Sequence, residues 1–357
     1  MTILNRENLL TAFNARPYSN WGGEDDALLS DSEPVDNQHR VLDINLEQKA
    51  EQWQPISCSL GLADDPRLPN WFLDGAVSSL EIAGTARDDN GYPRVIRAGQ
   101  LGVGATCRLP NVSNRKKFCR FIALNGSGYS HQQIAPLVSD LRQANIPHEL
   151  FVWHPANDKE KENAFDLMNI RTLVRNSTRD EMLIQEQKLV DEIAAPIYVD
   201  GRYVDHAPTH DAFLAVGIIK SQRARYLTQR PLEVLYSLRQ GERTPAFLIE
   251  RQRGQRGSNA NHIATFYVRL TSPDMVGPGS GLARIELSAR YFQQSSQDKM
   301  LLDAITSDLV RLRSRDNTYA RGAVTIEPIR LIERELHLIF RDGQMAAMDT
   351  MRLLYKK

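Results

Sequence analysis

The sequence predicts an α/β fold in which a mixed central sheet is flanked by helices and preceded by a polar N-terminal arm. Short apolar runs of strand length are interleaved with longer segments whose apolar residues recur at helical spacing, which favours α/β over all-α or all-β architectures. The 357 residues are 41% hydrophobic and 25% charged, which is typical of a globular chain that buries a core. No internal repeat of roughly 20–50 residues is present, so a solenoid or propeller is not expected.

The predicted arm spans residues 1–65, and the folded domain spans 66–357. The arm is polar and rich in turn-forming residues, with one helical stretch, VLDINLEQKAEQWQ, near its middle. The first strand signals follow it in NWFLDG, VSSLEIAG, YPRVIRAGQLGVGA and KKFCRFIALNG.

Further along, helices and strands alternate. A helix is expected in HQQIAPLVSDLRQANI and a short strand in ELFVWHP, and a second helix is expected to begin near Ser177, where Thr178 and Glu181 form a possible capping box. The remaining expected elements are the strands PIYVDGR and AVGIIKSQ, a hairpin of IATFYVRL with ARIELSARY, and the helices KMLLDAITSDLVRLRSR and EPIRLIERELHLIF.

Charge and cysteine content limit the class of protein. The 44 Lys and Arg residues balance 44 Asp and Glu residues, so no overall basic charge indicates a nucleic-acid partner. The sequence contains no apolar run of about 18 residues, so no membrane span is expected, and the N-terminus lacks a secretory pattern. The three cysteines have no C-x-x-C spacing, so neither a disulfide framework nor a zinc cluster is expected, and a cytoplasmic location fits best.

Two apolar strands end in Asp-Gly, at Asp74 and at Asp200. If the strands are neighbours, their carboxylates converge at the rim of the sheet, and a divalent cation is the economical way to neutralise them. Oxygen ligands select Mg²⁺ or Mn²⁺ over Zn²⁺ and suit phosphoryl transfer. The alternative is that each Asp-Gly is an ordinary turn after a strand.

Other charged segments support two further interpretations. The basic clusters KSQRARYLTQR, RQRGQR and RLRSR are either solvated faces or parts of a nucleic-acid groove, where a tyrosine would stack on a base. His206 and His210 have Pro208 between them, so a polar loop is favoured over a helical zinc site.

The order of these motifs resembles the NurA nuclease family from about residue 70 to the end. The motifs are WFLDG, an acidic helix, IYVDGRYVDH, VGIIKSQRARYL, and ATFYVRL with ARIELSARY. The resemblance implies a core similar to ribonuclease H and a role in DNA end processing with the hexameric translocase HerA. It does not extend to the first 65 or so residues.

Carried over by position, the resemblance makes Asp74 and Asp200 metal-binding aspartates. The family's intervening glutamate corresponds to Glu181, which suits the spacing better, or to Glu186. Lys220 matches a lysine that would contact a phosphate or stabilise charge in the transition state.

The sequence departs from the family near its C-terminus. The family commonly has a tyrosine followed eight residues later by a histidine, whereas here Tyr319 is followed by Glu327. A carboxylate can bind a metal but cannot take the histidine's role as a neutral donor or proton shuttle. The residues expected to meet nucleic acid are Arg223, Arg225, Tyr226, Arg253, Arg256 and Tyr319.

The expected function is therefore a Mn²⁺- or Mg²⁺-dependent DNA nuclease, in which Asp74, Glu181 and Asp200 hold one or two metal ions. Lys220 and Glu327 complete the expected catalytic set. By resemblance it would be a homodimer that docks on a HerA-like ATPase ring, in DNA repair or in antiviral defence. Two alternatives stay open: a non-catalytic subunit that regulates a translocase, and an RNA-directed nuclease on the same fold.

Overall fold

The protein is described by a computed structural model in which most residues after the first 39 are placed. The described residues are 40–83, 88, 90–129, 148–155, 165–208, 212–220, 226–252, 260–276, 279–292, 296–315, 322–340 and 342–355. The predicted helix HQQIAPLVSDLRQANI lies outside them.

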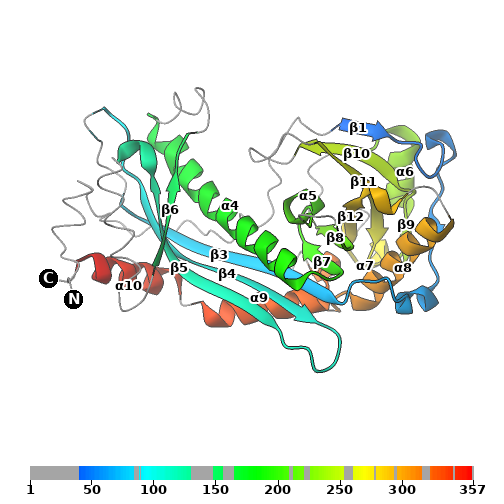
Figure 1. The fold of residues 1–357 in the computed structure, drawn as a ribbon. Coiled ribbons are helices and arrows are strands. Elements are labelled where there is room, and N and C mark those ends of the chain that lie inside the picture. Colours follow the sequence, from blue (N-terminus) through cyan, green and yellow to red (C-terminus); the bar gives the residue numbers. More distant parts are fainter. Residues whose placement is uncertain are drawn as a thin grey trace.

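The described strands join into one twelve-stranded mixed sheet that runs through the whole molecule (Figure 1). Its order is β1-β10-β11-β12-β8-β7-β3-β4-β5-β6, with the two-residue strands β2 (Ile56–Ser57) and β9 (Glu242–Arg243) beside β11. A mixed α/β architecture with a large central sheet is therefore confirmed.

The centre of the sheet is a five-strand unit. Three long strands form an antiparallel meander: β3 (Trp71–Ala83), β4 (Ile96–Cys107) and β5 (Arg115–Asn125). The long helix α4 (Leu167–Ile193) then leads to β7 (Ile197–Asp200), which lies parallel to β3, and β8 (Ala215–Ile219) lies parallel to β7. Across the sheet the five strands lie in the order β5-β4-β3-β7-β8, which is 3-2-1-4-5 when they are numbered along the chain.

Further strands extend both edges of this unit. β6 (His148–Trp153) pairs parallel to β5, and β12 (Leu282–Ser288) pairs antiparallel to β8. The predicted hairpin is confirmed, because β11 (Ala260–Arg269) pairs antiparallel to β12. β10 (Phe247–Gln252) and β1 (Arg40–Asp43) complete that edge.

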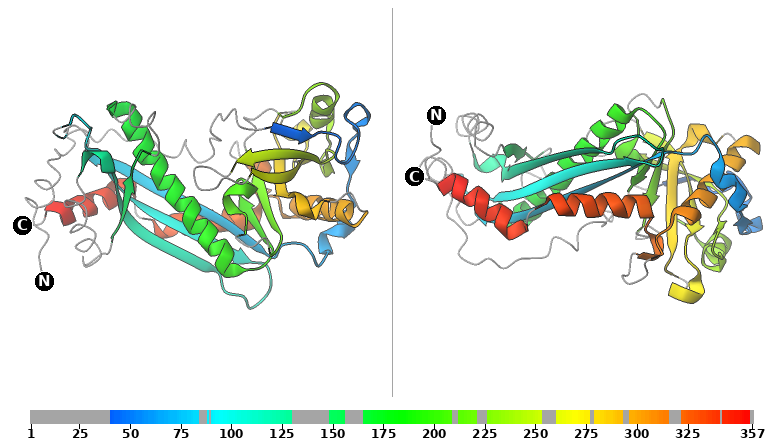
Figure 2. Two further views of the ribbon diagram at one scale, coloured as in Figure 1. Left: turned by 45° about the horizontal axis from the view of Figure 1, so that its top comes forward. Right: turned by 90° about the horizontal axis from the view of Figure 1, so that it is seen from below.

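Helices cover the two faces of the sheet separately (Figure 2). α4 packs against β3 to β6 on one face. α8 (Ser296–Leu312) and α9 (Glu327–Ile339) cover the other, and α10 (Gly343–Tyr355) continues beside β3 and β4. The short helices are α5 (Tyr203–His206), α6 (Gln229–Ser237) and α7 (Pro273–Val276).

Two local expectations are corrected. NWFLDG and VSSLEIAG form the single strand β3, because Gly75 continues the ladder with β4 instead of turning the chain. α4 begins at Leu167, where the side chain of Asp166 accepts a hydrogen bond from the Met168 amide. Thr178 lies inside this helix and donates its hydroxyl to a carbonyl of the preceding turn, so the capping box is wrong.

The described part of the predicted arm, residues 40–65, belongs to the core and the sheet. Trp53 is fully buried. The predicted helical stretch is replaced by the edge strand β1 at its start and by a single 3-10 turn, Ala50–Gln52, near its end. The Glu47 carboxylate accepts two hydrogen bonds from the buried guanidinium of Arg243, at 2.8 and 2.9 Å. A few anchoring side chains hold this polar segment, which is why its composition resembled an unpacked arm.

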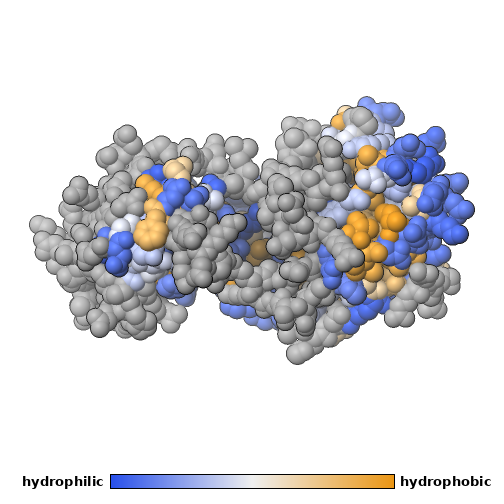
Figure 3. Space-filling view, turned by 90° about the horizontal axis from the view of Figure 1, so that it is seen from above, coloured by the Kyte–Doolittle hydropathy of each residue, from blue (hydrophilic) through white to orange (hydrophobic). Residues whose placement is uncertain are grey.

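In the described residues no helix is both long enough and apolar enough to cross a bilayer. Seen from above, hydrophobic residues gather in a patch on the half of the molecule that holds β7 to β12, with hydrophilic residues between the patch and the outer edge (Figure 3).

Candidate active site

Asp74, Asp200 and Lys220 come together on three neighbouring strands at the centre of the sheet. Leu73 of β3 is paired with Val199 of β7 in the two parallel strands. Asp74 and Asp200 are the next residues of these strands, so they lie side by side. Lys220 directly follows β8, which lies on the far side of β7.

All three side chains lie on the face covered by α8 and α9. Side chains alternate between faces along a strand. Phe72, Tyr198 and Ile218 each precede a site residue by two positions, and all three pack in the hydrophobic cluster built with α8 and α9. The strand period therefore directs both aspartates and the lysine to one side.

The electrostatics of this group are those of crowded carboxylates with one cation. Burial and the negative charge of Asp200 raise the pKa of the Asp74 carboxyl well above its ordinary value, while Lys220 acts in the opposite direction. The Lys220 ammonium forms an ion pair with Asp200, and both side chains are largely buried. One lysine thus serves two close carboxylates, and a bound cation would favour the ionised form of both.

Glu186, the alternative glutamate, lies close to Asp74 but on the opposite face of the sheet. A Cβ placed on Gly75 would lie 2.5 Å from Glu186 Oε1, so the absence of a side chain there admits the carboxylate. Glu186 is buried, and its Oε2 lies 2.8 Å from Nε2 of buried His206.

His206 bridges that carboxylate to the turn after Asp200. Its Nδ1 lies 2.9 Å from the Arg202 carbonyl oxygen. Because the carbonyl oxygen accepts a hydrogen bond and the carboxylate is negatively charged when ionised, this arrangement favours a protonated ring that donates from both nitrogens. Burial lowers the pKa of His206, but the Glu186 carboxylate outweighs that effect, so the pKa is raised.

Glu181, the glutamate favoured from the sequence, is directed elsewhere on α4. Its carboxylate accepts a hydrogen bond from the Gln185 amide at 2.9 Å, and its charge contributes to the raised pKa of Cys119 on β5. It is not among the groups that act on Asp74, whereas Glu186 is.

α9 contributes a carboxylate that the sequence argument missed. Glu333 is exposed on this helix, and its charge helps to raise the pKa of Asp74. Ile329, Ile332 and Leu336 are buried at helical spacing, and the last two lie over glycines of β4. That spacing is the sequence signal that could have indicated which side of the helix faces the sheet.

Glu327, expected from the sequence at the position of the family histidine, lies at the first turn of α9 and pairs with Arg330 at 2.7 Å. It is not among the groups that act on Asp74. It lines an open, arginine-rich pocket of about 690 Å³ whose other charged residues are Arg311, Arg313, Arg315 and Arg330.

Most residues predicted to meet nucleic acid lie outside the described part of the chain: Arg223, Arg225, Arg253, Arg256 and Tyr319. His210 does as well. Tyr226 is described and is buried, with the Arg284 guanidinium 4.9 Å above its ring. Its ring is therefore held in the core and is not available to stack on a base, which corrects that expectation.

The donor set suits a hard cation in its chemistry. Asp74 and Asp200 supply carboxylate oxygens whose mutual repulsion a divalent cation would relieve. Within the described ranges, no three His, Cys, Asp or Glu side chains are already arranged as a complete ligand group. All three cysteines are free, as the sequence predicted.

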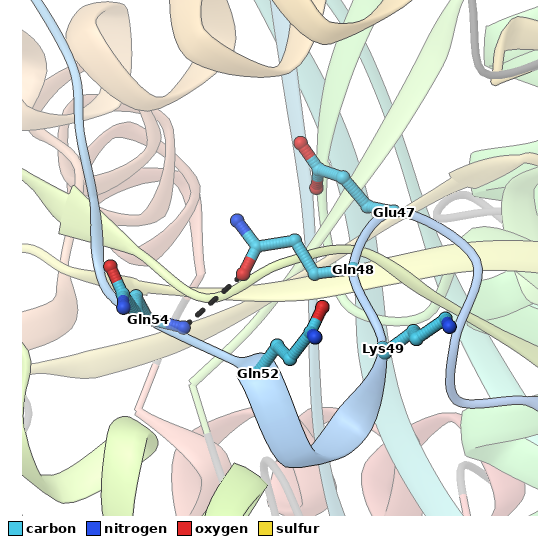
Figure 4. Close-up of a pocket in the computed structure, with 5 residues that line it drawn as sticks. All are labelled: Glu47, Gln48, Lys49, Gln52 and Gln54. Carbon is cyan, nitrogen blue, oxygen red and sulfur yellow. Dashed lines mark hydrogen bonds between the residues drawn. The ribbon is translucent and has the colours of Figure 1, made fainter.

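A second pocket of about 650 Å³ surrounds the turn before β2 and is lined by Glu47, Gln48, Lys49, Gln52 and Gln54 (Figure 4). Its one carboxylate, Glu47, is already bonded to Arg243 and to the Ala246 amide. The pocket therefore offers no second carboxylate and is not a rival metal site.

Comparison with known families supports the resemblance seen in the sequence. The model of the NurA domain matches residues 210–332, which include Lys220, the β10 to β12 strands, α8 and the first half of α9. No curated protein sequence matches the chain. Asp74 and Asp200 precede the matched segment, but β7 and β8 join them to it within one sheet. The chain is therefore similar to the NurA domain over residues 210–332.

Proposed function

We propose that this protein is a metal-dependent DNA nuclease of the NurA type. The observation that carries the proposal is the convergence of Asp74, Asp200 and Lys220 on one face at the centre of the sheet, in a chain with a NurA domain. Carboxylates for a cation beside a lysine for a phosphate are the parts that phosphodiester hydrolysis needs.

We also propose that the five-strand unit is an RNase H-like core. Its support is the strand order β5-β4-β3-β7-β8, with an antiparallel meander followed by two parallel strands and the α4 crossover. In this arrangement the two aspartates occupy adjacent parallel strands near the middle of the sheet.

In the proposed reaction, Asp74 and Asp200 hold Mn²⁺ or Mg²⁺. The bound metal would activate water for in-line attack and stabilise the departing oxygen. Lys220 Nζ, which Asp200 orients, would contact a phosphate oxygen and offset the negative charge that develops there. Glu333 on α9 would add negative charge at the open side of the site.

The proposal includes the partners expected of the family. DNA would be delivered by a HerA-like hexameric ATPase, and the nuclease would act as a homodimer in end processing or in defence against foreign DNA. The balanced charge of 44 basic and 44 acidic residues supports a need for such delivery, because unaided binding to a phosphate backbone would be weak.

The test is cleavage of matched linear double-stranded DNA, single-stranded DNA and RNA by the full chain with Mn²⁺, alone and with its ATPase. We expect DNA cleavage that Asp74→Ala and Asp200→Ala each abolish. Cleavage that survives both substitutions would refute the site, and preference for the RNA substrate would refute the DNA assignment.

The second candidate function is a non-catalytic subunit that regulates a translocase. It is favoured by Glu327, which replaces the family histidine and pairs with Arg330 instead of acting on Asp74. Stimulation of ATP hydrolysis by the ring, with no cleavage of any substrate, would establish this function.

A further inference from the structure

The turn that follows Asp200 is held from beneath by buried residues. Gly201 has a φ of 127°, which favours glycine, and its amide donates to the Ile218 carbonyl at 2.9 Å. The Tyr203 amide donates to the Glu286 carboxylate at 3.2 Å. Gly217 of β8 lets this turn approach, because a Cβ there would lie 2.5 Å from the Tyr203 nitrogen.

The Glu186–His206 pair joins this turn to the strand that carries Asp74. His206 binds the Arg202 carbonyl oxygen through one nitrogen and Glu186 through the other, at 2.9 and 2.8 Å. The other Glu186 oxygen occupies the space above Gly75, the residue after Asp74. One buried pair thus contacts the backbone next to each aspartate.

The pair does this from the face opposite to the aspartates. Leu73 and Val199, which directly precede the two aspartates, pack in the hydrophobic cluster that includes α4. Phe72 and Tyr198, one position earlier, pack in the cluster on the opposite face. With its two oxygens directed at Gly75 and His206, Glu186 is not directed at the metal-binding face.

We propose that Glu186 and His206 are positioning residues. From the α4 face of the sheet they hold Gly75 and the Gly201–Arg202 turn in place, and so fix the spacing of Asp74 and Asp200. The inference rests on the proposed metal-dependent function for its consequence, and on the structure alone for the clamp. It assigns the helix glutamate a role other than that of a metal ligand.

The experiment measures two properties of the full-length chain. Hydrogen exchange of residues 72–76 and 200–206, without metal, reports the clamp itself. Calorimetric titration with Mn²⁺, without DNA, reports its effect on the site. The variants are His206→Ala, His206→Gln and Glu186→Gln, with Glu192→Gln as the matched control because Glu192 lies exposed on the same helix.

We expect His206→Ala to speed exchange in both segments and to weaken Mn²⁺ binding by roughly 10- to 100-fold, the usual size of such indirect effects. Glu186→Gln keeps an oxygen that accepts from His206, so its loss should be smaller. His206→Gln places its amide near the position of Nε2, so it should restore part of the Mn²⁺ affinity. Glu192→Gln should match the wild type.

The outcomes separate the two proposals. A larger Mn²⁺ loss in Glu186→Gln than in His206→Ala would mean that Glu186 is a ligand, and would overturn the inference. Unchanged exchange in both segments would overturn it as well. Faster exchange in a chain whose wild type binds no Mn²⁺ would support the clamp and refute the metal-dependent function instead. If His206→Ala does not fold, Glu186→Gln and His206→Gln decide between these outcomes.

Discussion

The two faces of the sheet differ in kind where β3 and β7 lie side by side. On the α8 and α9 face, Asp74, Asp200 and Lys220 form a group with one cation for two carboxylates, and Glu333 adds charge at its edge. On the α4 face, Glu186 and His206 form a pair at 1–2% side-chain exposure, and His206 also contacts the Arg202 carbonyl oxygen.

This difference shows that a charged group close to Asp74 does not belong to the metal site merely because it is close. Both Asp200 and Glu186 act on Asp74, yet the strand period sends Asp74 to one face and the position of Gly75 to the other. On the α8 and α9 face two carboxylates share one lysine, which suits the binding of a cation. On the α4 face Glu186 and His206 pair with each other, which suits a structural role.

The largest effect expected is from Asp74→Asn or Asp200→Asn, which keep the shape of the side chain and remove a charge. Metal-dependent cleavage should fall by about a thousandfold. Because charge repulsion from Asp200 contributes to the raised pKa of Asp74, Asp74→Asn should not lower the melting temperature measured without metal. Asp191→Asn, on the exposed side of α4, is the control. Equal cleavage by all three variants would remove the aspartates from the site.

A smaller effect is expected from Lys220→Ala. Cleavage should fall by about a hundredfold through lost stabilisation of phosphate charge. The unfolding free energy should also fall, by about 3 kcal/mol, because Asp200 keeps its partly buried charge without a partner. Urea unfolding and initial cleavage rates measure the two effects. Lys220→Arg keeps the charge and should recover more stability than activity, and full recovery of both would show that only the charge matters.

The α4 face is tested by Gly75→Ala, whose new methyl group would lie 2.5 Å from Glu186 Oε1. We expect a loss of about 1–3 kcal/mol in unfolding free energy from this overpacking. Gly102→Ala is the matched substitution on the opposite face, where a Cβ would meet Phe340 and Leu336 at 3.0 and 3.1 Å. It should cost less, since flexible side chains give way more easily than a bonded carboxylate. The reverse order in thermal melts would argue against a rigid clamp.

The smallest effect is expected from Glu333→Gln. An exposed charge is worth at most about 1 kcal/mol, so Mn²⁺ affinity should weaken by no more than about fivefold in calorimetric titration. Glu335→Gln is the control, because Glu335 on the same helix pairs with Lys116 of β5. Loss of Mn²⁺ binding in Glu333→Gln would show that α9 supplies a true ligand, and so would extend the site beyond the two aspartates.

The glutamate on α4 shows where sequence reasoning reached its limit. Glu181 and Glu186 are five positions apart, which places them about 140° apart around a helix. The sequence offers both, and the spacing in the NurA family, which the sequence resembles, favoured Glu181. In the structure Met182 and Glu186 pack against Gly75, so Glu186, and not Glu181, is the glutamate of α4 that lies next to Asp74. The helix begins at Leu167, ten residues before the predicted start, because the side chain of Asp166 caps it there.

The sequence by itself determined most of the strands, the Asp-Gly end of β7 and the α/β alternation, because these depend on local period and turn chemistry. The same pattern at Asp74 was misleading, because β3 continues through Gly75. It also identified the hairpin of β11 and β12. Only the tertiary structure decided that β3 and β7 are neighbours, which face each charge occupies, and that residues 40–65 join the core through Trp53 and Glu47. Those outcomes depend on contacts between residues more than a hundred positions apart, and no local pattern encodes which of the possible partners is chosen.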